Sequence, residues 1–90
     1  MNNSNHQSDP AQRARLRWRA RRGLLENDLI VQKFLDNHEL ELSDEDVESL
    51  TLLLEMTDND LLDVLLGRRA PEEEYDQPGV RKIVQMMQSL

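Results

Sequence analysis

The sequence of 90 residues predicts an all-α protein, a compact five-helix bundle that forms a single domain. Three glycines and three prolines supply few tight turns, which disfavours a β-sandwich and favours helices. Aromatic residues make up only 3% of the chain, so the core has to consist of leucine, isoleucine, valine and methionine. A chain of this length encloses one small core, and no deep substrate cleft is expected.

The N-terminal part divides into a leader and the first helix. Residues 1–8 are polar and are predicted to be disordered, which leaves residues 9–90 as the helical domain. Asp9 is a suitable N-cap and Pro10 suits the first helical position, where its missing N–H costs nothing. We expect Gly23 to end this helix and to serve as N-cap of the next.

Arginines alternate with apolar residues from Arg13 to Arg21, a period of two that is typical of a strand. A helix is still predicted, because arginine, alanine and leucine are good helix formers and no β-branched residue interrupts them. This helix is expected to bury Ala14, Trp18 and the methylene stem of Arg21, with most guanidinium groups left in water.

Four further helices follow from apolar residues at helical spacing and from capping signals. The second is expected over residues 24–37. Ser43 and Thr57 are predicted N-caps of the third and fourth, Gly67 ends the fourth, and Pro78 begins the fifth. The predicted core contains Leu25, Leu29, Leu50, Leu53, Leu54, Leu61, Leu65, Ile83, Val84 and Met87.

The charge of the chain is segregated. Residues 1–23 carry a net charge of +5, whereas residues 24–90 carry −12. Arginines that contact phosphates can supply non-specific nucleic-acid affinity, so a small nucleic-acid- or ribosome-associated protein is one hypothesis. Most of the molecule repels phosphate and no recognition helix follows, so this is the alternative and nucleic acid is not the expected partner. A transit peptide is disfavoured because the arginines lie inside the helical pattern.

Catalysis and metal binding have little support in the sequence. There is no cysteine, and His6 and His38 lack the spacing of metal ligands. The acidic runs at residues 44–46 and 72–74 suit a helix start and a solvated connector. No apolar run approaches the roughly 20 residues that span a bilayer. We therefore predict no enzyme, no catalytic or metal site and no membrane insertion, and expect a soluble cytoplasmic protein.

The segment RRGLLEND, residues 21–28, is more informative. Glu26 at the third position of a helix can accept a hydrogen bond from the Gly23 N–H and complement the positive helix end. This accounts for Gly23 and Glu26. It leaves Arg22 unexplained, because the helix dipole disfavours a cation at a helix start.

Two motifs stand out by their residue types and their spacing. They are Trp18-x-x-x-Arg22-Gly23-x-x-Glu26-x-Asp28 and, further along, Leu53-Leu54-Glu55 with Asp58-x-Asp60-Leu61. Over roughly residues 11–88 this pattern resembles the SdhE family, the small flavinylation and assembly factors of succinate dehydrogenase. The family signature Arg-Gly-x-x-Glu is carried by Arg22, Gly23 and Glu26. One position departs from the pattern, Val64, where relatives often have tryptophan.

The resemblance implies a five-helix protein that is not an enzyme. It would bind the flavoprotein subunit of succinate dehydrogenase, and in some bacteria that of fumarate reductase, and promote covalent attachment of FAD to a histidine of that subunit. The chain itself would hold no covalent FAD and is expected to be a monomer.

On this resemblance Arg22, Gly23 and Glu26 are the predicted partner-binding residues, with Arg22 pairing with a carboxylate or the FAD pyrophosphate of the client. Arg19 and Arg21 would add electrostatic steering, and Asp28 would anchor the corner internally.

Overall fold

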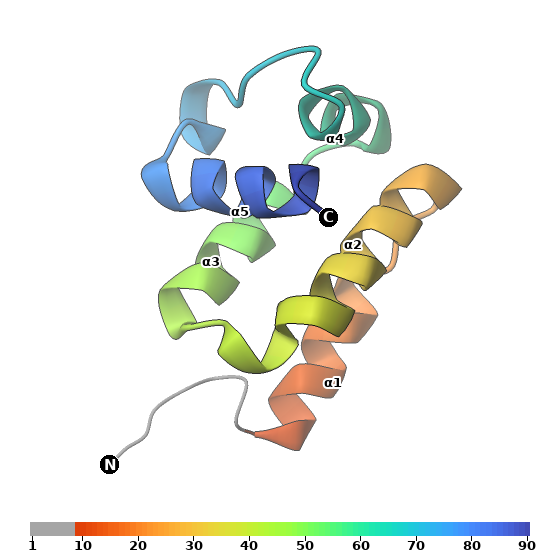
Figure 1. Ribbon diagram of the computed structural model, residues 1–90, viewed down its shortest axis with the longest axis vertical. Helices are drawn as coiled ribbons and strands as arrows, with labels where there is room; N and C mark the ends of the chain where they lie inside the picture. Colours follow the sequence, from red (N-terminus) through yellow and green to blue (C-terminus); the bar gives the residue numbers. More distant parts are fainter. Residues whose placement is uncertain (1–8) are drawn as a thin grey trace.

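The computed structural model describes residues 9–90, which fold into five α-helices and two short 3-10 helices without any strand (Figure 1). The elements are α1 (Pro10–Arg19), α2 (Leu25–His38), η2 (Glu39–Glu41), α3 (Asp44–Leu53), α4 (Asp58–Leu65), η3 (Glu73–Tyr75) and α5 (Pro78–Gln88). In Figure 1, α1 and α2 lie side by side at one flank, while α3, α4 and α5 form the rest of the bundle. The predicted all-α five-helix fold is confirmed. The predicted leader, residues 1–8, lies outside the described residues.

The predicted helix starts are present with their caps. Asp9 Oδ1 accepts a hydrogen bond of 2.9 Å from the Ala11 N–H at the start of α1. Ser43 forms a full capping box with Asp46, in which the side chain of each accepts from the main-chain N–H of the other at 3.1 Å. Thr57 Oγ1 accepts a hydrogen bond of 3.3 Å from the Asp60 N–H in the first turn of α4. Local sequence therefore determines where these helices begin.

Gly67 ends α4 as predicted, in the left-handed conformation with φ of 76°. Its N–H donates to the Val64 carbonyl at 3.1 Å, and the Arg68 N–H donates to the Asp63 carbonyl at 2.8 Å. This pair of bonds is the Schellman motif, which needs a residue without the usual penalty for positive φ.

The prediction that Gly23 ends α1 and is the N-cap of α2 is wrong. Helix α1 stops at Arg19 with Ala20 as its C-cap, and the N-cap of α2 is Leu24. Because Ala20 is fully buried, α1 is anchored in the core before the chain reaches Gly23. The residues between the two helices form a non-helical connection.

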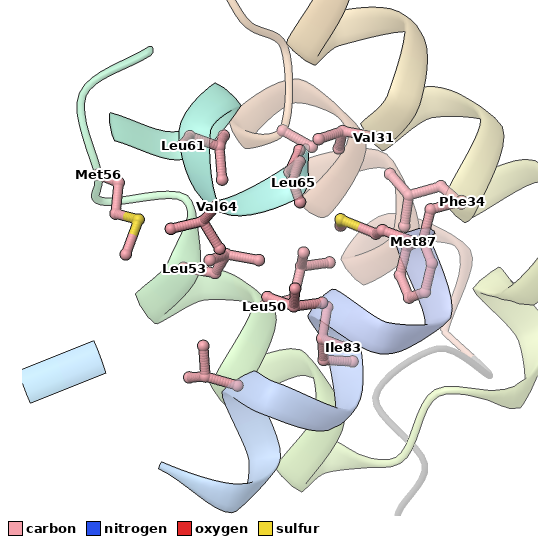
Figure 2. Packing of buried hydrophobic residues seen from close by; sticks show 14 of the residues in the cluster. Val31, Phe34, Leu50, Leu53, Met56, Leu61, Val64, Leu65, Ile83 and Met87 are labelled. Carbon is pink, nitrogen blue, oxygen red and sulfur yellow. The ribbon is translucent and has the colours of Figure 1, made fainter. Parts of the chain in front are cut away.

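The core is built from all five α-helices. Figure 2 shows Phe34 of α2, Leu50 of α3, Leu65 of α4 and Met87 of α5 converging on the same interior. Most of the predicted core is confirmed, with Leu54 only partly buried at its edge. The buried apolar residues are Leu16, Ala20, Val31, Phe34, Leu35, Leu42, Val47, Leu50, Leu53, Met56, Leu61, Val64, Leu65, Val80, Ile83, Val84 and Met87.

Leu25 and Leu29 were predicted in the core, and the structure contradicts this. Their exposed fractions are 64% and 60%. Helix α2 carries two apolar stripes, and the one that contains Val31 and Phe34 is buried. Residues four apart share a face of a helix, so Leu25 and Leu29 lie together on the side that this choice leaves outside.

The predicted buried stripe of α1 is also wrong. Trp18 is 76% exposed and Ala14 is exposed, while Leu16 and Ala20 enter the core. Trp18 and Leu16 are two residues apart and thus point to different sides of the helix. The small Ala20 and the compact Leu16 allow α1 to approach the other helices, and the indole remains outside.

Candidate functional site

The candidate site is the connection between α1 and α2, residues 21–28, which we call the Arg-Gly corner. Arg22 is its most constrained side chain. Its Nε donates to Asp58 Oδ1 at 2.8 Å, and Nη1 and Nη2 donate to the main-chain oxygens of Leu54 and Met56, both at 2.7 Å. Only 12% of the Arg22 side chain is exposed. The guanidinium group therefore ties the Arg-Gly corner to the turn between α3 and α4.

Asp58 is the acceptor at the centre of this network. Besides Arg22, it receives the Leu24 N–H on Oδ2 at 3.2 Å and Asn27 Nδ2 on Oδ1 at 3.2 Å. The hydrogen bond from Asn27, together with the bond and charge of Arg22, holds the pKa of Asp58 below its usual value. Asp58 is also the first residue of α4, where the helix dipole favours a negative charge.

Asn27 joins the same network from inside α2. It is fully buried, and its Nδ2 donates to the Asp58 main-chain oxygen at 2.8 Å. The start of α2 is thereby fixed to the start of α4 by both main-chain and side-chain acceptors.

Asp28 anchors the Arg-Gly corner through a different bond. Its Oδ1 accepts from the Arg22 main-chain N–H at 3.1 Å. The bond predicted between Glu26 and the Gly23 N–H is absent, because Glu26 is the second residue of α2 and the N-cap lies one residue later than expected. Within residues 9–90 the Glu26 side chain has no hydrogen-bond partner and is exposed. Glu26 is thus available to an external donor.

Gly23 is exposed at the tip of the Arg-Gly corner. A Cβ added there would lie 3.5 Å from Asp58 Oδ2, an ordinary van der Waals distance, and Gly23 does not have a positive φ. The fold therefore does not require glycine at this position. What glycine provides is main chain that another molecule can approach closely.

The arginines of α1 and of the connection that follows it differ in their contacts. Arg17 is held by Glu39 Oε2 at 3.0 Å and Asp36 Oδ1 at 2.9 Å, and these bonds, that of Glu39 first, raise its pKa. Arg19 and Arg21 are exposed, and neither has a carboxylate partner in the described part of the chain. Some arginines stabilise the fold, and others remain free to bind a partner.

The structure brings the predicted site residues from Arg21 to Asp28 into one corner, with Arg19 at the end of α1. Sequence analysis missed Asn27, although a polar residue four positions before Val31 and seven before Phe34 indicates a polar group in an apolar stripe. It also did not predict that the two motifs meet, with Asp58 of the second holding Arg22 of the first.

The arrangement is suited to binding. Residues 9–90 contain no group of three or more side chains placed to hold a metal ion. Arg22, Asp28 and Asp58 are occupied with one another or with main chain. The groups that face outward are the Gly23 main chain, the Glu26 carboxylate and the Arg21 guanidinium.

Val64, the position at which relatives often have tryptophan, is 1% exposed and packs in the core (Figure 2). Valine in place of tryptophan therefore changes the packing of the core at α4 and not the outer surface. No helix of residues 9–90 combines the length and the hydrophobicity needed to cross a bilayer.

Comparisons with known proteins identify the family of this chain. The family Sdh5, described as "Flavinator of succinate dehydrogenase", matches residues 14–88. Among curated proteins, the FAD assembly factor SdhE of Ralstonia nicotianae is 58% identical over 94% of this chain and 90% of its own length. The SdhE proteins of Shewanella oneidensis and Coxiella burnetii are 40% and 33% identical, over 81% and 88% of this chain and 85% and 96% of their own lengths.

No solved structure gives a significant match. The family match covers α1 to α5 and includes both motifs that meet at Arg22 and Asp58. The chain therefore belongs to the Sdh5/SdhE family, the FAD assembly factors of succinate dehydrogenase, which are assembly proteins and not catalysts.

Proposed function

We propose that this chain binds the flavoprotein subunit of succinate dehydrogenase through its Arg-Gly corner and thereby promotes covalent attachment of FAD to that subunit. Membership of the family supports the role. The observation that carries the choice of surface is Gly23, which is exposed, is not required by the fold and lies between Arg22 and Leu24, both of which donate to Asp58. Such a position suits close contact with a partner's main chain.

The side chains of the Arg-Gly corner have different parts in this proposal. Arg22 positions Gly23 and does not reach the client, because its guanidinium group is committed to Asp58, Leu54 and Met56. Glu26 accepts hydrogen bonds from donors of the flavoprotein, and Arg19 and Arg21 steer association and pair with its carboxylates. Asp28 keeps the corner in shape.

A factor of this kind acts on the conformation of its client. A ligand shifts an equilibrium only by its difference in affinity for the two states, so the chain must bind one state of the flavoprotein more tightly. That state is the one in which the flavin and the acceptor histidine are close enough to react. The client holds the FAD, and this chain binds none covalently. The flavoprotein of fumarate reductase is a second client in bacteria that have it.

The factor would act as a monomer in the cytoplasm, where the flavoprotein subunit is assembled. The nucleic-acid hypothesis gains no support from the structure. Two of the six N-terminal arginines, Arg17 and Arg22, are paired with carboxylates inside the fold. Residues 24–90 carry a net charge of −12, which repels the phosphates of a nucleic acid.

The test is complementation in a bacterial strain that lacks its own factor. Covalent flavin on the succinate dehydrogenase flavoprotein is measured as fluorescence that survives denaturing electrophoresis. Expression of this chain should restore that fluorescence, and an empty vector should not. Unchanged low fluorescence, with the chain present at normal level, would rule out the proposed function in that host.

A further inference from the structure

The outer surface beside the Arg-Gly corner carries three large apolar side chains. Trp18 of α1 is 76% exposed, and Leu25 and Leu29 of α2 are 64% and 60% exposed. We call these three residues the apolar shelf. Burial of large apolar side chains is the main source of stability in a folded domain, so a cluster of them outside indicates a surface that is covered by something else.

Helix geometry and a groove place the three side chains on one surface. Leu25 and Leu29 are four residues apart and thus adjacent on α2. Trp18 lines an open groove of about 490 Å³ together with Asp28 and Gln32 of α2. Asp28 is three positions after Leu25, and Gln32 is three positions after Leu29, so both lie beside the leucines on α2. The two leucines therefore lie next to the groove that Trp18 lines.

Unpaired arginines surround Trp18. Arg15 lies three residues before it and Arg21 three residues after it, and Arg21 also lines the groove. Within residues 9–90, Arg15, Arg19 and Arg21 are exposed and have no carboxylate partner, whereas Arg17 and Arg22 are paired. Arg15 and Arg21 thus flank Trp18, and Arg19 follows it directly in the sequence.

We propose that the apolar shelf is the central contact of the docking surface for the flavoprotein subunit, with Trp18 inserted into an apolar pocket that carboxylates surround. This inference rests on the proposed function. Tryptophan and arginine dominate the energetics of protein interfaces when they are buried at the centre. The shelf is also continuous with the Arg-Gly corner, since Leu25 belongs to both, and Arg21 and Asp28 of the corner line the groove beside Trp18.

Charge favours this occupant over a second copy of the chain. A twofold dimer through the shelf would place Arg15, Arg19 and Arg21 against the same three residues of its partner. Like charges brought together in this way repel. The carboxylates of Asp28 and Asp36 are already bonded to the Arg22 N–H and to Arg17, so the Glu26 carboxylate is what remains beside the shelf to offset three arginines. A partner with an acidic rim around an apolar pocket avoids the repulsion.

Trp18 is the only tryptophan of the chain, so it can report directly on the shelf. The full chain is labelled with 5-fluorotryptophan, which gives one 19F resonance, and is titrated with purified succinate dehydrogenase flavoprotein that lacks covalent flavin. We expect this resonance to shift and broaden as the complex forms. In parallel, Trp18→Ala, Leu25→Ala and Leu29→Ala should each weaken binding, with a loss of about tenfold or more for Trp18→Ala.

Two exposed leucines outside the shelf serve as matched controls. Leu40 is 69% exposed and Leu66 is 51% exposed, so Leu40→Ala and Leu66→Ala remove similar apolar surface elsewhere. These variants should bind as the parent does. Circular dichroism should show that all five variants keep their helices, because none of the five side chains is buried.

The possible failures are distinguishable. If the unaltered chain neither binds the flavoprotein nor raises its covalent flavin, the proposed function itself is wrong. If the unaltered chain does both and Trp18→Ala binds equally well, only the role of the shelf is overturned. A 19F resonance that responds to protein concentration or to an oligonucleotide, and not to the flavoprotein, would also overturn it, in favour of self-association or nucleic-acid binding.

Discussion

Arg22 Nε lies 2.8 Å from Asp58 Oδ1, and this pair joins the two segments that carry the family resemblance. Arg22 and Asp58 are 36 positions apart in the sequence. The two segments are held together further because Arg22 also donates to the carbonyl oxygens of Leu54 and Met56. An arginine expected to bind a client is therefore a structural residue that holds Gly23 at the surface. The predictions below follow from this division of roles.

Arg22→Ala should lower the free energy of unfolding by about 2 to 4 kcal/mol, because it leaves a carboxylate and two carbonyl oxygens without donors. Arg22→Lys should lower it by less, because an ammonium group keeps a positive charge and hydrogen-bond donors near Asp58. It should not match the parent, because one ammonium group cannot reach all three acceptors in the same way. Urea denaturation followed by circular dichroism measures both. Arg19→Ala is the control, because Arg19 is exposed, and should change stability by less than about 0.5 kcal/mol. Equal stability of Arg22→Ala and Arg19→Ala would contradict the structural role.

Asp58 makes part of the stability dependent on pH. Its pKa in the folded chain lies below the ordinary value of 3.8, because Asn27 and Arg22 favour the carboxylate. The associated stabilisation is present above the unfolded pKa and is lost as the pH falls through the folded pKa. The difference in unfolding free energy between the parent and Asp58→Asn should therefore begin to narrow as the pH falls below about 5, and should go on narrowing until the pH has passed the folded pKa of Asp58. A constant difference across that range would show that the charge of Asp58 is not what stabilises the network.

Gly79 is in close contact with α3, in contrast to the open position of Gly23. A Cβ on Gly79 would overlap Ser49 Oγ and lie 3.3 Å from Ser49 Cβ, where α5 begins against α3. Gly79→Ala should cost about 1 to 3 kcal/mol, and adding Ser49→Ala should recover part of the loss. Gly23→Ala is the matched control and should change stability by less than about 1 kcal/mol. Thermal melts of these three variants and of Ser49→Ala alone test this, and additive effects of the two substitutions at Gly79 and Ser49 would contradict it.

Leu53 and Leu29 allow a buried leucine to be compared with an exposed one. Leu53 is fully buried, so Leu53→Ala should cost about 2 to 5 kcal/mol. Leu29 is 60% exposed, so Leu29→Ala should change stability by less than about 0.5 kcal/mol. Urea denaturation of Leu53→Ala, Leu29→Ala and the parent chain under the same conditions measures both effects. A large loss for Leu29→Ala would mean that α2 buries the stripe that the sequence originally suggested.

The parts of the fold that depend on neighbouring residues could be predicted from the sequence. Ser43 with Asp46, Asp9 and Gly67 act within one turn of their own position, so pattern recognition finds them. The choice of buried face could not be predicted for α2, because Leu25 and Val31 are equally apolar and only tertiary packing selects between them. The contrast between short-range and long-range determinants explains most of the errors.

The candidate site shows the same limit. The motif identified Arg22, Gly23 and Glu26, but the role of Arg22 depends on acceptors more than 30 positions away. Nothing within residues 21–28 indicates that Asp58 will take up the guanidinium group. Asn27 has a local signal as a polar residue in an apolar stripe, yet its partner is again on α4.

The central claim is that the Arg-Gly corner is built by the fold for contact with a flavoprotein, and Gly23→Arg tests it most directly. Because Gly23 is exposed and has no positive φ, this variant should keep its helical circular dichroism and melt close to the parent. Its new side chain would nevertheless separate the factor from the client. In a strain without another copy of the factor, covalent flavin fluorescence on the succinate dehydrogenase flavoprotein should fall to the level of the empty vector, with Gly23→Ala much closer to the parent. Normal covalent flavin with a folded Gly23→Arg variant would contradict the claim.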